Sequence, residues 1–271
     1  MRSSFARSLV AVVSFAGAVI AAAPAFAGNA WEEIRGSIYG DKKIEDGRGM
    51  ITLTAPNRPD DMRVVPIGIA AHLTDGRSIK TVSYIIDENP TPVVAVFHMG
   101  PGRDAVALNV NFRVDRQSDV RAVVETDDGK LYMVSQLVKF AGGQSSCSAP
   151  PMGDPAEIVA NMGKMNVTEI KGEGAVSSAL MHAKIDLNHP NHTGMVMDQI
   201  TLLYTPMKMI SEVTVRQGND VVFKAEGSIG LSQNPVVDFD FKRGGSGLLE
   251  VTMTDTDGGT WTKSFPIGPQ S

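Results

Sequence analysis

The chain has 271 residues, with 25 lysines and arginines against 30 aspartates and glutamates, so its formal net charge is −5. This acidic balance disfavours nucleic acid as a partner. The length suffices for two domains of ordinary size, each able to bury its own hydrophobic core.

The first 27 residues have the pattern of a secretory signal peptide. Arg2 and Arg7 form a positively charged start, the run from Leu9 to Ala23 is apolar, and Ala25-Phe26-Ala27 has the small-x-small form of a cleavage site. The apolar run is shorter than the roughly 20 residues that span a membrane. We therefore expect cleavage near Gly28 and a soluble protein of the bacterial periplasm.

The mature chain is predicted to begin with a short helix and to continue as strands. Asn29 is a suitable N-cap, and Trp31, Ile34 and Ile38 recur at near-helical spacing. Short β-branched and aromatic runs then alternate with turn signals, a pattern typical of an antiparallel sandwich. The predicted strands are Arg63 to Leu73, Ile79 to Ile86, Val93 to Met99, Ala105 to Val114, Asp119 to Glu125 and Leu131 to Phe140.

The strand pattern breaks at residues 142–153 and then resumes. Asp154-Pro155 predicts an N-cap followed by proline in the first turn of a short helix. The fold class is therefore all-β, with two immunoglobulin-like antiparallel β-sandwich domains, 28–141 and 154–271, joined by the flexible linker 142–153. The strands predicted in the second domain are Val167 to Ile170, Ala175 to Asp186, Ile200 to Tyr204, Ile210 to Gln217, Asp220 to Glu226, Pro235 to Phe241, Gly247 to Thr254 and Thr260 to Ile267.

Cys147 is the only cysteine, and it lies in this linker. A single thiol in an exported protein is either a buried small hydrophobic side chain or a group that reacts outside the chain. Flanking glycine, serine and proline favour a solvated, reactive thiol on a flexible arm. No histidine, arginine or lysine lies within seven residues, which suits a passive handle better than a catalytic nucleophile. The arm comprises Gly142, Gly143, Ser145, Ser146 and Ser148.

A copper or electron-transfer protein is the alternative class. A cupredoxin-like site needs a histidine and a methionine shortly after the cysteine, and Met152 is present there without the histidine. His189 and His192, with Met195 and Met197, form a denser cluster suited to loose Cu(I) binding, although methionine on strands commonly fills gaps in a core. We expect no bound cofactor and keep His189 and His192 as the minor metal-binding alternative.

Several stretches carry a family resemblance. In the first half they are 51–56 (Ile-Thr-Leu-Thr-Ala-Pro), 86–90 (Ile-Asp-Glu-Asn-Pro) and 123–132 (Val-Val-Glu-Thr-Asp-Asp-Gly-Lys-Leu-Tyr). In the second half they are 189–194 (His-Pro-Asn-His-Thr-Gly), 219–226 (Asn-Asp-Val-Val-Phe-Lys-Ala-Glu), Asn234-Pro235 and Trp261-Thr262. Through them the first half resembles SoxY and the second half resembles SoxZ. The mature chain is similar to the fused SoxYZ-like carriers that are associated with quinoprotein dehydrogenases.

The resemblance implies a carrier rather than an enzyme. In the family, a cysteine on a glycine-rich arm at the end of the SoxY part takes sulfur intermediates of thiosulfate oxidation as a covalent adduct, and Cys147 occupies that place. Two differences stand out: the family's Gly-Gly-Cys-Gly-Gly is replaced at 142–149 by Gly-Gly-Gln-Ser-Ser-Cys-Ser-Ala, and the arm is tethered at both ends. The implied partners are sulfur-oxidation enzymes, or a quinoprotein dehydrogenase and its cytochrome. The two halves are expected to pack together as a heterodimer would.

Overall fold

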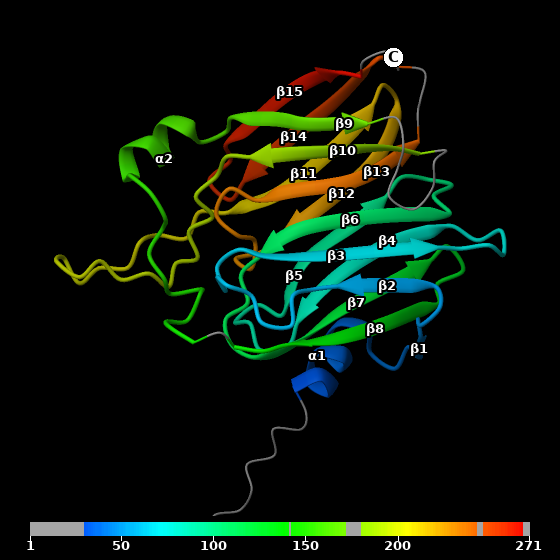
Figure 1. The fold of residues 1–271 in the computed structure, drawn as a ribbon, viewed down its shortest axis with the longest axis horizontal. Helices are drawn as coiled ribbons and strands as arrows, with labels where there is room; N and C mark the ends of the chain where they lie inside the picture. Colours follow the sequence, from blue (N-terminus) through cyan, green and yellow to red (C-terminus); the bar gives the residue numbers. More distant parts are fainter. Residues whose placement is uncertain (1–29, 141, 172–179, 243–245, 268–271) are drawn as a thin grey trace, which may run out of the picture.

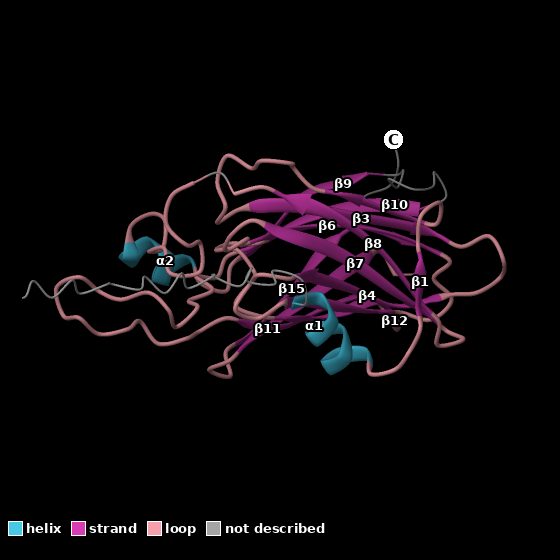
Figure 2. Ribbon diagram, turned by 90° about the horizontal axis from the view of Figure 1, so that it is seen from below, coloured by secondary structure: helices cyan, strands magenta, loops and turns pink. Residues whose placement is uncertain are grey.

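Two β-sheets stacked face to face make up most of the protein (Figure 1, Figure 2). The computed structural model describes residues 30–140, 142–171, 180–242 and 246–267, and the expected signal peptide lies outside these ranges. The predicted all-β sandwich class is confirmed.

The first half contains one helix and eight strands. They are α1 (Ala30–Tyr39), β1 (Ile44–Asp46), β2 (Ile51–Thr54), β3 (Val65–His72), β4 (Ile79–Ile86), β5 (Val93–Met99), β6 (Ala105–Phe112), β7 (Ser118–Thr126) and β8 (Leu131–Val138). The second half contains α2 (Pro155–Asn161), β9 (Met165–Lys171), β10 (Leu180–Leu187), β11 (Ile210–Gln217), β12 (Asp220–Gly227), β13 (Val236–Lys242), β14 (Leu248–Asp255) and β15 (Thr260–Pro266).

Alternation of buried and outward residues explains why these runs form strands. In β3, for example, Val65, Ile67, Ile69 and Ala71 point into the core, while the residues between them are more exposed. A period of two places every second side chain on the same face of a sheet, and branched side chains pack well there. The predicted bounds of β4, β5 and β11 match the observed ones, although β4 is buried on both faces over its second half.

Both sheets run through both halves of the chain. The larger sheet has the order β1-β8-β7-β4-β5-β12-β11-β14-β15, and the smaller has the order β2-β3-β6-β13-β10-β9. At the junction, β5 pairs with β12 and β6 pairs with β13, both antiparallel. Among the described strands, β1 and β8 form the single parallel pair, which departs from the predicted antiparallel pattern.

The hydrophobic core is also continuous across the junction. The ring of Phe97 on β5 meets the ring of Phe223 on β12 edge to face, with centroids 5.1 Å apart. Tyr84 extends this aromatic chain into the first half and Phe239 extends it into the second. The prediction that the halves pack together is therefore confirmed, and what the sequence presents as two domains is one packed body.

Helix α1 covers the outer face of the larger sheet in the first half (Figure 2). Trp31 and Ile34 pack against Ile85 and Leu131, and the guanidinium of Arg121 lies 4.4 Å from the Trp31 ring centroid. The predicted helix is thus present, and its apolar face contacts the sheet. Among the described residues, no helix is long and apolar enough to cross a membrane.

Three sequence expectations differ from the structure. Ile200 to Tyr204, predicted as a strand, forms the tip of a projecting hairpin, where Tyr204 makes only an isolated bridge to Met197. Strands β1 and β2 were not predicted, because each is only three or four residues long. The first residues of the predicted strand Ala175 to Asp186 lie outside the described residues, and β10 begins at Leu180.

Single-tryptophan variants test whether the two halves unfold together. Trp31 reports on the first half and Trp261 on the second, so Trp261→Phe and Trp31→Phe each leave one probe. Because the core is shared, we expect both probes to give the same midpoint in urea. Phe223→Ala should lower both midpoints, since truncating a buried phenylalanine costs roughly 3–5 kcal/mol. Tyr204→Ala, at an exposed site, is the control. Two separate midpoints would contradict the single packed body.

Candidate functional site at the junction of the two halves

Cys147 lies between β8 and α2, at the end of the sandwich where β3 begins and β6 ends. Its exposed fraction is 0%, so the expectation of a solvated thiol is wrong for this conformation. Its backbone is held by hydrogen bonds with residues distant in sequence, which a local composition pattern does not contain.

The first half fastens the cysteine through Asp115, which follows β6. One oxygen of this carboxylate, Oδ1, accepts the backbone N–H of Cys147 at 3.0 Å and also the hydroxyl of Ser145. Ser148 closes the turn, because its N–H donates to the carbonyl of Ser145 at 3.2 Å. Hydrogen bonds to a carboxylate are stronger than neutral ones, so Asp115 is a firm attachment point.

The second half fastens the same segment at two further points. The hydroxyl of Thr193 donates to the Cys147 carbonyl at 2.6 Å. The side-chain amide of Gln233 bonds both backbone groups of Met152, accepting its N–H and donating to its carbonyl, each at 2.8 Å. We call Asp115, Thr193 and Gln233 the clamp. Because its members come from both halves, the cysteine is held at the junction itself.

Asp115 is in turn positioned by a buried polar network. Its N–H donates to the side chain of Asn89 at 2.9 Å, and Asn89 donates to the carbonyl of Arg113 at 2.8 Å. The guanidinium of Arg113 reaches across the junction to the carbonyls of Leu231 and Ile229. Buried polar groups that are fully bonded fix a unique arrangement, so this network sets where the clamp sits.

The surroundings keep the thiol protonated. Burial raises the pKa of Cys147 to about 12, and the negative charge of Asp115 acts in the same direction, while the positive charge of Arg113 opposes it. Burial also lowers the pKa of Arg113 to about 10, so its guanidinium remains charged at neutral pH. Since the thiolate is the reactive form, this environment holds Cys147 in its less reactive, protonated form.

The predicted arm is only partly free of contacts. Gly142 and Gly143 are exposed and have φ angles of 99° and 98°, a region that suits glycine. Ser145 is fastened to Asp115, Ser146 is buried, and the hydroxyl of Ser148 donates to the Ser145 carbonyl at 3.3 Å. Residues 145–148 are therefore held in a defined position, and two glycines precede them in the connection from β8.

The two histidines of the alternative metal site have different environments. Both ring nitrogens of buried His189 are engaged, Nδ1 with Asn191 at 3.0 Å and Nε2 with Asp255 at 3.5 Å. His192 instead lines a groove beside Ser148, and burial lowers its pKa, with the charges of Arg113 and Lys208 acting the same way. In the described part of the chain, no three histidines, cysteines or carboxylates are grouped to hold a metal ion.

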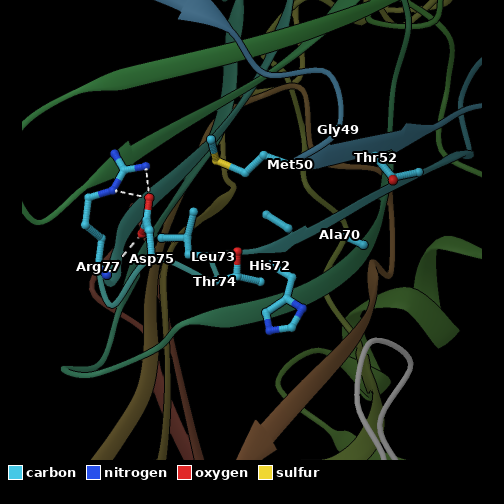
Figure 3. Close-up of a pocket in the computed structure, with 10 residues that line it drawn as sticks. Gly49, Met50, Thr52, Ala70, His72, Leu73, Thr74, Asp75 and Arg77 are labelled. Atoms are coloured by element: carbon cyan, nitrogen blue, oxygen red, sulfur yellow. Dashed lines mark hydrogen bonds and ion pairs between the residues drawn. The ribbon is translucent and has the colours of Figure 1, made fainter.

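A second hollow, of about 450 Å³, lies at the opposite end of the sandwich (Figure 3). It is lined by residues of β2, the end of β3 and the turn that follows, including His72 and Arg77. Arg77 already donates to Asp75 at 2.6 Å and to the Tyr132 hydroxyl at 2.7 Å, so its guanidinium is already paired within the protein. An eight-residue strand is roughly 25 Å long, which separates this hollow from the cysteine.

Comparisons with known proteins match each half to one family. The model of sulfur oxidation protein SoxY matches residues 35–144, and that of sulphur oxidation protein SoxZ matches residues 158–266. The structure of the sulfur carrier protein SoxY from Chlorobium limicola f thiosulfatophilum is 24% identical, covers 40% of this chain and 94% of that chain, and has a TM-score of 0.33. No curated protein matches the chain.

The fold and the site define a two-part β-sandwich protein whose single thiol is held where the parts join. The chain carries a SoxY domain followed by a SoxZ domain and belongs to these families as a fused SoxYZ-like protein. The families indicate a carrier function in sulfur oxidation. Cys147 lies between the two matched ranges, so its role is argued from the geometry above and from the resemblance.

The clamp residues were missed by sequence reasoning. Thr193 falls within a stretch that resembles SoxZ, which is a weak signal for a role, and Asn89, which positions Asp115, falls within one that resembles SoxY. For Asp115, the only signal in the sequence is its position, because it is a carboxylate directly after a predicted buried strand. Gln233 carries no signal in the sequence, because only the tertiary structure brings it to Met152.

Thiol labelling tests the clamp. At neutral pH we expect slow reaction of wild-type Cys147, since the raised pKa lowers its thiolate fraction roughly a thousandfold. Asp115→Ala leaves the donors of Cys147 and Ser145 unpaired, which costs roughly 1–3 kcal/mol and should speed labelling about fivefold or more. Thr193→Val should act in the same direction. Asp104→Ala, an exposed carboxylate at the opposite end, is the control. Wild-type labelling as fast as that of unfolded protein would contradict the clamp.

The pH dependence of stability provides a second test. The folded thiol keeps its proton up to a pKa of about 12, whereas the unfolded thiol loses it above about 9. The unfolded state then binds fewer protons, so stability falls as pH rises between these values, by about 1.4 kcal/mol per pH unit. We expect urea titrations at pH 8–11 to show this loss for wild type relative to Cys147→Ala. Parallel curves would contradict the buried thiol.

Proposed function

We propose that this protein is a periplasmic covalent carrier of sulfur intermediates and that Cys147 is the attachment point. The observation that carries the proposal is the position of the only thiol, at the junction of a SoxY and a SoxZ domain and held by side chains of both. The protein itself performs no catalysis in this proposal. It presents the cargo to sulfur-oxidation enzymes, or to a quinoprotein dehydrogenase and its cytochrome.

Loading with thiosulfate follows a simple balance. The S–H bond of Cys147 breaks, its proton passes to water, and Sγ forms an S–S bond with the outer sulfur of thiosulfate. Two electrons leave the pair of sulfurs and pass to the oxidising partner, for example two one-electron transfers to the haem groups of a cytochrome. The product is a cysteine S-thiosulfonate, which carries a negative charge.

This product does not fit the closed clamp. The thiol is fully buried beside Asp115, so an added sulfonate would meet both packed atoms and a like charge. Loading therefore requires the segment to leave its seat, and the loaded arm stays in solvent. The clamp then protects the empty thiol from unspecific oxidation, which proceeds through the exposed thiolate.

The double tether limits how far the opened arm extends. Cys147 is five residues from Met152, which Gln233 holds in place, and five extended residues span at most about 18 Å. The cargo cannot reach far from the body of the carrier. An enzyme that acts on it must therefore seat closely against this end of the protein.

Intact mass of the protein purified from its source organism grown on thiosulfate tests the proposal. We expect a fraction of the wild-type chains to carry an added sulfur-containing mass that reducing agent removes, and Cys147→Ser to carry none. The replacement should leave the fold intact, so unfolding midpoints serve as the control. Wild-type protein with an unmodified thiol throughout growth would contradict the carrier function.

A further inference from the structure

A hairpin projects from the second half beside the cysteine segment (Figure 1, yellow). It spans residues 192–208 and is joined at its base by the bridge of His192 to Lys208 and further out by the bridge of Met197 to Tyr204. We call residues 199–207 its tip. The side chain of Asp198 fixes the turn, because Oδ1 accepts the N–H of Ile200 at 3.0 Å and that of Thr201 at 2.7 Å.

The tip is apolar and exposed. Ile200 is 92% exposed, Leu202 65% and Leu203 69%, and the Tyr204 ring beside them is also exposed. Residues 199–207 include no charged side chain. Single exposed apolar residues are common, but a contiguous group of this kind marks an interaction site.

The backbone of the tip adds an independent observation. Leu202 has a φ of 57°, in the left-handed region that suits glycine or asparagine. Stability alone would place one of those residues at this turn. A large apolar side chain held outward in a strained conformation is typical of a functional position.

The hairpin and the cysteine segment enclose a common groove of about 990 Å³. Its walls include Ser148, Pro150 and Pro151 on one side and Met197 and Tyr204 on the other. At the base of the hairpin, Thr193 is the residue that bonds the Cys147 carbonyl at 2.6 Å. The tip and Thr193, one of the three clamp residues, are thus parts of one continuous chain segment.

We propose that the tip of this hairpin is the docking surface for the enzyme that loads Cys147. The proposal rests on the proposed carrier function, since a doubly tethered arm requires its enzyme to sit against this end of the protein. The partner is a protein with an apolar, uncharged patch beside the entrance of its active site. Such a patch complements the exposed apolar side chains of the tip, while the neighbouring carboxylate of Asp198 is engaged by the N–H groups of Ile200 and Thr201.

The size of the tip favours a transient partner over a second copy of this chain. Stable interfaces use about 20–30 residues on each side, whereas the tip has nine residues. A small apolar contact with a few anchoring side chains suits an enzyme that must release the carrier after each cycle. Contact with the partner also reaches the segment that carries Thr193, which places docking next to the opening of the clamp.

Adduct formation in the source organism tests the docking surface. Wild type, Leu202→Asn, the double variant Ile200→Asn/Leu203→Asn and the control Leu248→Asn are purified from cells grown on thiosulfate, and the fraction with an adduct on Cys147 is measured by intact mass. Leu202→Asn keeps a residue suited to positive φ and removes only the apolar side chain. Leu248 is 49% exposed at the opposite end of the sandwich. In vitro reaction of each purified variant with tetrathionate checks that the thiol and fold are intact.

We expect roughly a tenfold or greater loss of adduct in both hairpin variants, with Leu248→Asn and all tetrathionate reactions unchanged. If wild type carries the adduct and the hairpin variants carry the same fraction of it, the docking proposal is overturned and the carrier function stands. An unloaded wild type would overturn the carrier function and the docking surface with it. Sedimentation showing a wild-type dimer that the hairpin variants lose would overturn the choice of an enzyme as the occupant.

Discussion

The hydrogen bond from the backbone N–H of Cys147 to the carboxylate of Asp115 is the interaction on which the site depends. It ties the linker to the end of β6, and β6 is the strand through which the smaller sheet passes into the second half. Thr193 and Gln233 complete the clamp from that second half. The clamp therefore exists only while the two halves are packed as one body, which connects the shared core to the state of the thiol.

The fold was largely predictable because the strands follow local patterns. Short β-branched and aromatic runs between turn signals placed β4, β5 and β11 at their observed bounds, and Asp154 caps α2 as its sequence indicated. Ile200 to Tyr204, within the tip, were predicted as a strand, since this exposed apolar run has the same composition as residues buried in a sheet. Sequence periodicity does not distinguish apolar residues that are buried in the core from apolar residues that are exposed on the surface.

The site was only half predictable. The single cysteine in a glycine- and serine-rich linker stood out at once, but its burial did not. The segment is held in its buried position by hydrogen bonds with Asp115 and Thr193, which lie 32 and 46 residues away along the chain. A charged and a hydroxyl side chain at those distances give no local signal. The composition therefore predicted a mobile linker, whereas tertiary hydrogen bonds hold it in one position. The proposed attachment of cargo to this buried thiol therefore requires two states, one protected and one presented.

Hydrogen exchange at the Cys147 amide tests the central claim of a clamp that holds the empty thiol and releases the loaded one. Tetrathionate converts the thiolate to the S-thiosulfonate with loss of thiosulfate, which gives a defined loaded form. The clamp predicts a protected amide in the free-thiol protein and fast exchange after loading, with the core strand β4 protected in both forms. Equal protection of the Cys147 amide in the two forms would contradict the account.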